Sequence, residues 1–258
     1  MNHGRQSETV HTWRWQVHGA LIITKKNVLL YYLKPPVLIF GILFPLFFYL
    51  AFTMGRPVPA QSLVPGMIAM ALWFTATAIG PLVTPWERAA KTYERLITTP
   101  ISLPALLTGD VLSGLIFGVC LSTIPVALGL AYTPVLLSQP LHLVAGVGLG
   151  ALAFAALGVL LSAPPTSGPS NIMLLSNLVR LPLLFVSGIF LPISQMPTWA
   201  RWLAPASPLS YTADLMRSSF GEPTYFPLWL CPTMLLIFTA IFFWGACQFH
   251  QQGKHKGL

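Results

Sequence analysis

A cluster of charged residues lies between two long apolar stretches of this sequence, in the segment 86–100. Its five charges are carried by Glu87, Arg88, Lys91, Glu94 and Arg95. Such groups need water or a binding partner, because a buried unpaired charge is costly. Glu87 and Lys91 are four residues apart in the acid-before-base order that stabilises a helix, and Pro100 ends that helix. The segment predicts a short charged helix in water, and its spacing alone leaves open whether it is a docking site or a solvated turn.

Two further charged residues, Asp110 and Arg180, fall inside apolar stretches. An unpaired arginine near the centre of a bilayer costs at least about 2.5 kcal/mol. Arg180 could line a path through the membrane and meet an anionic head group. Alternatively it could form a structural bond to Asp110 or to carbonyl groups freed by Pro182. We favour the structural interpretation.

The composition excludes a soluble globular protein. Of the 258 residues, 55% are hydrophobic and only 8% are charged, whereas soluble proteins carry roughly 25% charged residues. The net charge of +8 comes mainly from basic residues at the ends of apolar runs, which indicates membrane topology and not nucleic-acid binding. Three scattered cysteines and six scattered histidines give no spacing typical of a metal site or a disulfide framework.

Six apolar segments, each of about 19 residues or more, are long enough to cross a hydrocarbon core of about 30 Å. The sequence therefore predicts an all-α, polytopic membrane protein, with kinks at Pro45, Pro125 and Pro182. The predicted spans are 36–54, 63–84, 105–131, 141–162, 171–191 and 226–247.

The first 34 residues predict an amphipathic helix on the membrane surface. Apolar side chains recur at helical spacing while basic ones fall on other faces; the apolar positions are Trp13, Val17, Ala20, Leu21, Thr24 and Val28. We expect two parts, an interfacial helix in 1–34 and a single transmembrane domain in 35–258.

Basic residues set the expected orientation, because they are enriched in cytoplasmic loops. With both termini in the cytoplasm, three basic residues lie outside, Arg56, Arg201 and Arg217, and ten lie inside, Arg5, Arg14, Lys25, Lys26, Lys34, Arg88, Lys91, Arg95, Lys254 and Lys256. The opposite orientation reverses this ratio. The segment 86–100 is thus predicted to be cytoplasmic, between spans two and three.

The long connection 192–225 is then external. It is rich in proline and semi-apolar, which predicts an interfacial or re-entrant segment. It could act as a lid over an exit or simply seal the helix ends, and Asp214 and Arg217 are spaced to pair on a helix. Its candidate residues are Pro192, Pro197, Trp199, Pro208, Tyr211, Asp214 and Arg217.

Two motifs carry a resemblance to a known family. The first is Glu87-Arg88-x-x-x-Thr92-x-Glu94-Arg95-Leu96-x-x-Thr99-Pro100-Ile101-Ser102. The second is Phe185-x-Ser187-Gly188-Ile189-Phe190-x-Pro192-Ile193-Ser194-x-Met196-Pro197-x-Trp199, followed by Pro208-Leu209-Ser210-Tyr211-x-x-Asp214-x-x-Arg217. Both resemble ABC-2 type transporter permeases, which include daunorubicin-type drug exporters and nodulation-factor exporters. The family often has glycine where this chain has Lys91, a difference that bears on the turn before Thr92.

The resemblance implies a permease that pairs as a homodimer or with a sister subunit in the cell membrane, above two ATP-binding-cassette subunits. The chain has no G-x-x-x-x-G-K-[ST] phosphate-binding motif, so ATP and Mg²⁺ are expected on the partner ATPase. The implied cargo is a hydrophobic or amphipathic drug, lipid or lipid-linked glycan. The residues expected to contact the ATPase are Glu87, Arg88, Lys91, Thr92, Glu94, Arg95, Leu96 and Pro100.

Two alternatives from other classes stay open at this point. One is a membrane-embedded enzyme that modifies lipids, although the spans offer few acids, histidines or cysteines in clusters. The other is a non-transporting anchor subunit of a membrane complex.

Overall fold

The computed structural model describes residues 3–31, 60–92, 101–132, 137–164 and 169–255, together with residues 39, 43, 47, 51 and 96. Within these ranges the regular elements are all helical, as the composition predicts. Five helices there are long and apolar enough to cross a membrane: Leu63–Ala89, Leu103–Ala131, Pro140–Leu161, Pro169–Val186 and Leu230–Gln252. The predicted span 36–54 lies almost wholly outside the described residues, so the count of six stays a prediction.

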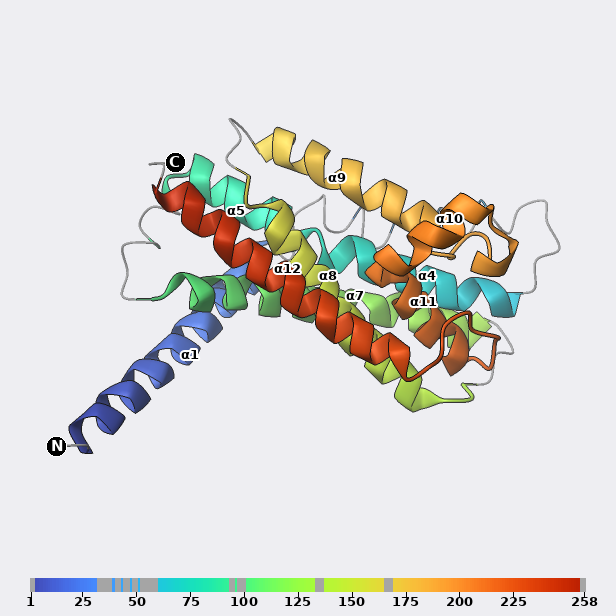
Figure 1. Cartoon of the computed structure of the whole chain (residues 1–258), viewed down its shortest axis with the longest axis horizontal. Coiled ribbons are helices and arrows are strands. Elements are labelled where there is room, and N and C mark those ends of the chain that lie inside the picture. Colours follow the sequence, from blue (N-terminus) through green and yellow to red (C-terminus); the bar gives the residue numbers. More distant parts are fainter. Residues whose placement is uncertain are drawn as a thin grey trace.

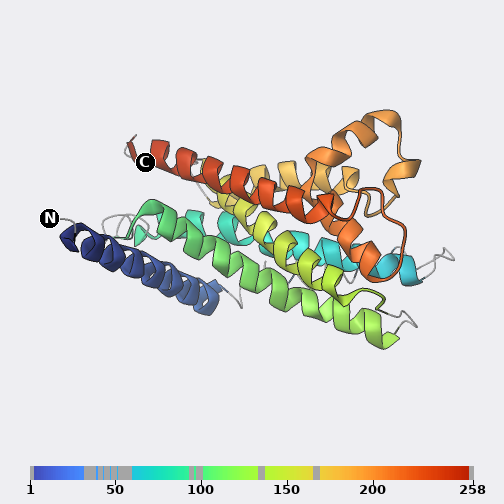
Figure 2. The same ribbon diagram turned by 60° about the horizontal axis from the view of Figure 1, so that its bottom comes forward.

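Helix α8 (Pro140–Leu161) forms the centre of the bundle. It packs against α7 (Leu103–Tyr132), α12 (Leu230–His255) and α11 (Pro208–Ser219). Its 22 residues give a length of about 33 Å at 1.5 Å per residue, which matches a hydrocarbon core. Figures 1 and 2 show the long helices running side by side, with α9 (Pro169–Val186) along one face.

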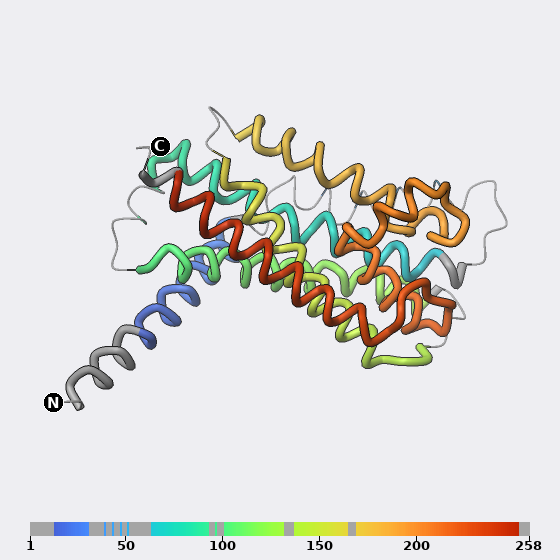
Figure 3. The backbone as a smooth tube through the Cα atoms, viewed as in Figure 1, coloured from blue at the N-terminus to red at the C-terminus, as the bar shows by residue number. Residues whose placement is uncertain are grey.

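Helix α1 (His3–Tyr31) packs against α7, and the coloured part of α1 lies toward the same end of the bundle as the C-terminal end of α12 (Figure 3). The side of α1 that is buried carries Gly19, Ala20, Ile23, Thr24 and Asn27. The buried side matches only part of the apolar face that the sequence predicts, because Trp13, Val17 and Leu21 of that face are exposed. Those exposed side chains are available to lipid, and the position of α1 on a membrane surface stays a prediction.

The last two predicted spans differ from the observed helices at their ends. The span predicted at 171–191 ends at Val186, because the chain turns at Gly188 with a φ of +86°. This is a left-handed conformation that glycine adopts at little cost. The span predicted at 226–247 begins at Leu230 and its helix continues to His255, since apolar content alone does not show where the preceding turn ends.

The span Leu63–Ala89 is interrupted. It consists of α4 (Ala60–Ala76) and α5 (Ile79–Ala89), joined end to end (Figure 1). The Ala78 N–H bonds to the Thr75 carbonyl at 3.2 Å and not to the carbonyl of Phe74, as α-helical pairing would require. Pro81 has no N–H with which to continue the ladder. The interruption therefore leaves the Phe74 carbonyl without its usual helical donor. Helices α7 and α9, by contrast, continue through Pro125 and Pro182.

Close contact between α5 and α8 depends on glycine. A Cβ atom built on Gly80 would lie 2.1 Å from the Gly158 carbonyl oxygen, and one on Gly158 would lie 2.6 Å from the Thr77 carbonyl oxygen. Small residues are what allow two membrane helices to approach so closely.

The connection 192–225 is more ordered than an interfacial loop. It contains η2 (Ile193–Gln195), α10 (Thr198–Leu203), η3 (Ala204–Ala206) and α11. Pro192 and Pro197 precede η2 and α10, and Pro208 is the first residue of α11, a position that its fixed φ suits. Almost all of α11 is buried, against α8, α4 and α12. The segment thus closes one end of the bundle with a packed helix.

The glycine contact gives a test of the packing. Replacing Gly80 with alanine forces α5 away from α8, and we expect the free energy of unfolding to fall by about 1–3 kcal/mol, the usual cost of overpacking. Denaturation of the detergent-solubilised protein measures this. Gly148→Ala is the matched control, because nothing lies within 4 Å of a Cβ built at Gly148. Equal stabilities of the two variants would contradict the proposed contact.

Candidate coupling site

The end of α5 is tied to α1 by an ion pair. The Lys26 ammonium donates a hydrogen bond to the Glu87 carboxylate. Only 6% of Glu87 is exposed, so the expectation that the whole charged cluster stands in water is wrong for this residue. The predicted pairing of Glu87 with Lys91 is also replaced, because α5 ends at Ala89 and the helical spacing stops before Lys91.

A second polar contact joins α1 to α7. The Asn27 side-chain amide donates to Asp110 Oδ1 at 2.7 Å and to Ser113 Oγ at 3.3 Å. One turn earlier, the Thr24 hydroxyl donates to the Gly109 carbonyl at 3.1 Å. The four side chains and the Gly109 carbonyl are all buried. Hydrogen bonds between buried groups are specific and costly to break. Asp110 therefore lies in a helix–helix contact, which is a structural place for a residue proposed to line a path.

Arg88 ties α5 to α8. Its guanidinium donates to the carbonyl groups of Pro164 at 3.3 Å and Ala163 at 3.5 Å. These carbonyls follow the end of α8 at Leu161, where a helix carries partial negative charge. A cation there compensates the helix dipole and holds α5 against α8.

The chain leaves α5 through a left-handed residue. Lys91 has a φ of +56°, the one positive value for a non-glycine residue in the described part of the chain. Its N–H bonds to the Arg88 carbonyl at 3.0 Å, and the Thr92 hydroxyl bonds to the Glu87 carbonyl at 3.2 Å. The left-handed turn explains why glycine is common here in the family that the sequence resembles.

Lys91 and Thr92 are exposed. Further along the segment, Leu96 is half-buried against an apolar cluster that includes Ile23 and Leu106. Glu94, Arg95 and Pro100 lie outside the described residues, so their predicted roles stay untested. On the C-terminal side of the charged segment, the Ser102 N–H donates to Gln16 Oε1 of α1 at 2.7 Å. Helix α1 thus contacts the chain on both sides of the charged segment.

The partners of the two intramembrane charges differ, because Asp110 accepts from Asn27 while Arg180 bonds to groups of Phe74 and Asn177. Arg180 Nη2 donates to the Phe74 carbonyl at 2.8 Å, the group that the α4–α5 interruption releases. Its guanidinium also lies 4.9 Å from the centre of the Phe74 ring, within cation–π range. The structural interpretation thus has the right kind of partner but the wrong residue, since the freed carbonyl is on α4 and not beside Pro182.

The other end of the bundle holds the predicted Asp214–Arg217 pair. Arg217 Nη1 lies 3.6 Å from Asp214 Oδ1, too far for a hydrogen bond but close enough for a Coulombic attraction. Asp214 Oδ2 accepts the N–H groups of Tyr225 at 2.9 Å and Phe226 at 2.8 Å. Burial raises the pKa of Asp214, while the Phe226 N–H, the Arg217 charge and the Tyr225 N–H oppose that rise.

Tyr211 completes this end of the bundle. Its hydroxyl donates to the Pro205 carbonyl at 3.0 Å and its ring stacks on Phe226 at 4.6 Å. Trp199, on α10, is 64% exposed, as is typical of residues at a membrane–water interface. The predicted residues 192–217 lie at one end of the bundle, and residues 87–92 with Leu96 lie at the other (Figure 1).

Sequence reasoning missed Lys26 and Asn27 as members of the site. Lys26 was counted only for topology, and Asn27 is a polar residue between apolar positions of a helix. That position of Asn27, on the same face as Ile23 and Thr24, is the one signal that could have indicated a buried contact.

The chain is similar to known membrane proteins. A family model described as ABC-2 type transporter matches residues 19–220. The daunorubicin resistance ABC transporter permease protein DrrB1 of Streptomyces coeruleorubidus is 30% identical over 190 residues, covering 70% of this chain and 64% of that protein. The chain thus spans just under two thirds of the length of that relative.

Nodulation protein J of two species is also similar. The protein of Bradyrhizobium diazoefficiens is 29% identical over 189 residues, covering 68% of each chain. That of Rhizobium leguminosarum bv. trifolii is 30% identical over 172 residues, covering 62% of each chain.

The Lys26–Glu87 pair can be tested by reversing charges. Glu87→Lys places two cations together in a partly buried site, and we expect lower thermal stability of the purified protein. Adding Lys26→Glu restores the attraction, with a coupling energy of about 0.5–3 kcal/mol in a double-mutant cycle. Lys25→Glu is the matched control, because Lys25 is exposed on the same helix. Equal rescue by Lys25→Glu and Lys26→Glu would show that the pair is not specific.

The role of Arg180 is tested by two substitutions. Arg180→Ala removes the side-chain donor of the Phe74 carbonyl in an apolar environment, and we expect a loss of about 1–3 kcal/mol of stability. Arg180→Lys can still donate to that carbonyl and should recover part of the loss. Denaturation of the purified variants measures both. Wild-type stability of Arg180→Ala would favour a role in the path over a structural one.

Proposed function

Because the chain belongs to the ABC-2 type transporter family, we infer that it is the membrane subunit of an ATP-driven exporter. In this proposal a separate ATP-binding-cassette ATPase binds ATP and Mg²⁺ and supplies the energy. The ATPase docks on the exposed residues that follow α5, beginning at Lys91 and Thr92. Movement of the ATPase then tilts the spans as rigid bodies, one of the known routes to a switching transition.

The observation that carries the proposal is the way in which α5 is held. Its last turn is joined to α1 through Glu87 and to the end of α8 through Arg88. A force applied to the exposed turn at Lys91 is therefore passed to two other helices and is not absorbed by a loose loop. A solvated turn without a partner would need no such attachments.

We propose that both termini and the charged segment face the cytoplasm of a cell membrane, in the orientation that the basic residues favour. Two copies of the chain, or one copy and a sister subunit, pair above two ATPase subunits. The cargo is a hydrophobic or amphipathic compound, and similarity to a daunorubicin resistance permease supports a drug-like molecule.

Site-directed crosslinking tests docking and orientation together. In a variant without Cys120, Cys231 and Cys247, a single cysteine replaces the exposed Ala90 at the end of α5. We expect it to crosslink to a co-expressed ATPase in membranes and to resist an impermeant maleimide added from outside. The matched control is Thr198→Cys, exposed on α10, which should react with the maleimide and not crosslink.

Two results would contradict the proposal. One is labelling of the Ala90→Cys variant from outside the cell. The other is an intact complex in which the ATPase hydrolyses ATP at the same rate with wild-type chain and with the Glu87→Lys variant, which would favour a non-transporting anchor subunit.

A further inference from the structure

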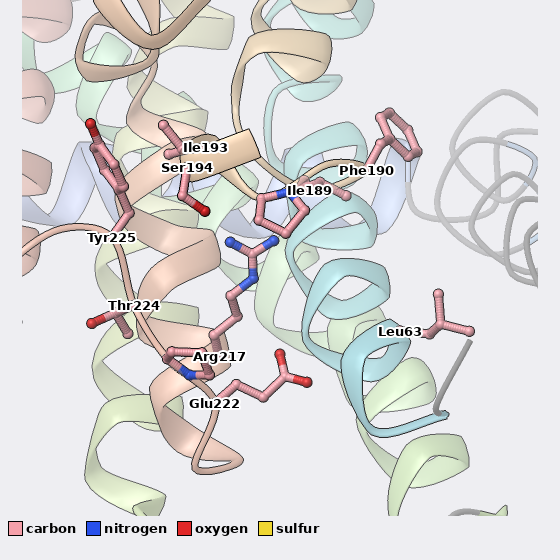
Figure 4. Close-up of a pocket in the computed structure, with 11 residues that line it drawn as sticks. Leu63, Ile189, Phe190, Ile193, Ser194, Arg217, Glu222, Thr224 and Tyr225 are labelled. Atoms are coloured by element: carbon pink, nitrogen blue, oxygen red, sulfur yellow. The ribbon is translucent and has the colours of Figure 1, made fainter. Parts of the chain in front are cut away.

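A cavity of about 480 Å³ lies at the end of the bundle away from the charged segment. It is formed by the start of α4, the turn after α9, the end of α11 and the loop that leads to α12 (Figure 4). Its volume is within the range of pockets that bind small organic molecules. The coupling site makes no use of it.

The walls of the cavity are largely apolar. Leu63, Ile189 and Ile193 supply aliphatic side chains, and Arg217 brings a guanidinium among them. In Figure 4 the Arg217 side chain extends toward Ile189, while the Glu222 carboxylate lies on the side nearer Leu63. A ligand that fills this space therefore lays an apolar body against the aliphatic side chains and meets the guanidinium with its polar part.

Arg217 has more hydrogen-bond donors than its protein partners use. A guanidinium carries five N–H groups and no acceptor. Within the described residues, its one hydrogen bond runs from Nη2 to the Gly188 carbonyl. Arg217 Nη1 lies 3.6 Å from Asp214 Oδ1, which is too far for a hydrogen bond. The side chain is 13% exposed and lines the cavity, so its remaining N–H groups are reachable from that space.

The kind of polar group that fits follows from these donors and from Asp214. An N–H group binds an acceptor atom, which excludes a cationic group as the partner of Arg217. The Asp214 carboxylate is fully buried and already offsets the guanidinium charge, so an anion gains less there and is repelled by Asp214. An uncharged carbonyl or hydroxyl oxygen accepts the N–H groups without that repulsion. A hydrocarbon leaves the donors unpaired, and polar sites reject ligands for that reason.

We propose that this cavity binds a molecule with an apolar body and an uncharged acceptor oxygen, the body against Ile189 and Ile193 and the oxygen on Arg217. Burial of the body supplies affinity, and the guanidinium supplies selectivity for the oxygen. Soluble amphipathic compounds and the ester carbonyl groups of membrane lipids both offer this chemistry. The site does not depend on the proposed transport function, because binding is a property of the chain without an ATPase.

Photolabelling with benzophenone tests the site. Benzophenone has an apolar body and a carbonyl oxygen, and on irradiation it attaches to C–H groups beside that carbonyl. The full chain is placed in phosphatidylcholine nanodiscs, and the labelled peptides are identified by mass spectrometry. We expect saturable labelling of peptides that contain residues 189–194 or 222–225. Labelling that is confined to other peptides, or that does not saturate, overturns the proposal.

Two competitors test the role of the oxygen. Diphenylmethanol carries a hydroxyl group, and diphenylmethane has nearly the same shape without oxygen. At equal concentrations in the bilayer, we expect diphenylmethanol to compete with benzophenone at least about tenfold more strongly, because diphenylmethane leaves the Arg217 donors unpaired. Equal competition by the two compounds overturns the choice of ligand.

Two variants locate the binding. Ser194→Trp should fill the cavity and abolish labelling, whereas Gln195→Trp, exposed on η2 beside it, should leave labelling unchanged. Arg217→Met should remove the preference for diphenylmethanol, while Arg14→Met, exposed on α1, should keep it. Unaltered labelling of Ser194→Trp overturns the assignment to this cavity. A preference that survives Arg217→Met overturns the role of the guanidinium. Because Ser194 is exposed, its variant remains a test where Arg217→Met fails to fold.

Nanodiscs of ether-linked phosphatidylcholine distinguish the two sources of the oxygen, since these lipids lack ester carbonyl groups. Stronger labelling of the cavity in ether-linked than in ester-linked nanodiscs identifies a lipid as the resident ligand, because the competing carbonyl is then missing. Equal labelling in both identifies a soluble molecule.

Discussion

In hydrocarbon, a backbone carbonyl that loses its helical partner must find another donor within the protein, because water is not there to replace it. The span Leu63–Ala89 meets this constraint with a side chain from another helix. Its interruption releases the Phe74 carbonyl, and Arg180 of α9 supplies the N–H group. The same contact answers the reverse question of why a membrane protein keeps an arginine inside a span. Burying the guanidinium is costly. That cost is partly offset because the guanidinium donates to a carbonyl that has no backbone donor in its own helix.

The attachment of the charged segment follows similar reasoning at the other end of α5. Glu87 is buried but paired with Lys26, and Arg88 is directed at the carbonyl end of α8. Each charge has a partner on a different helix, so the last turn of α5 cannot move without disturbing α1 and α8. Asp110 strengthens the same corner through Asn27. The charged cluster is therefore held in the bundle up to Arg88 by contacts with two other helices.

The sequence predicted those parts of the fold that depend on local composition. Helices α7 and α8 have nearly the expected bounds, because long runs of apolar residues leave little choice in a bilayer. Prolines were less informative. Pro125 and Pro182 lie within continuous helices, while the interruption falls at 77–78, ahead of Pro81. Contacts over long sequence separations were beyond reach. The pairing of Lys26 with Glu87 spans 61 positions, and nothing in either local pattern identifies the other residue.

The interrupted span also connects the two ends of the molecule. Its first residue, Leu63, lines the cavity beside Arg217 and Glu222, and its last turn carries Glu87 and Arg88. A continuous helix would transmit any displacement between these ends as a rigid rod. Here the helix is interrupted at 77–78, where the Thr77 and Ala78 N–H groups bond to the Trp73 and Thr75 carbonyls and Arg180 donates to the Phe74 carbonyl. Because Arg180 of α9 donates to a carbonyl of α4, α9 is attached to this span at the point where its helix is interrupted.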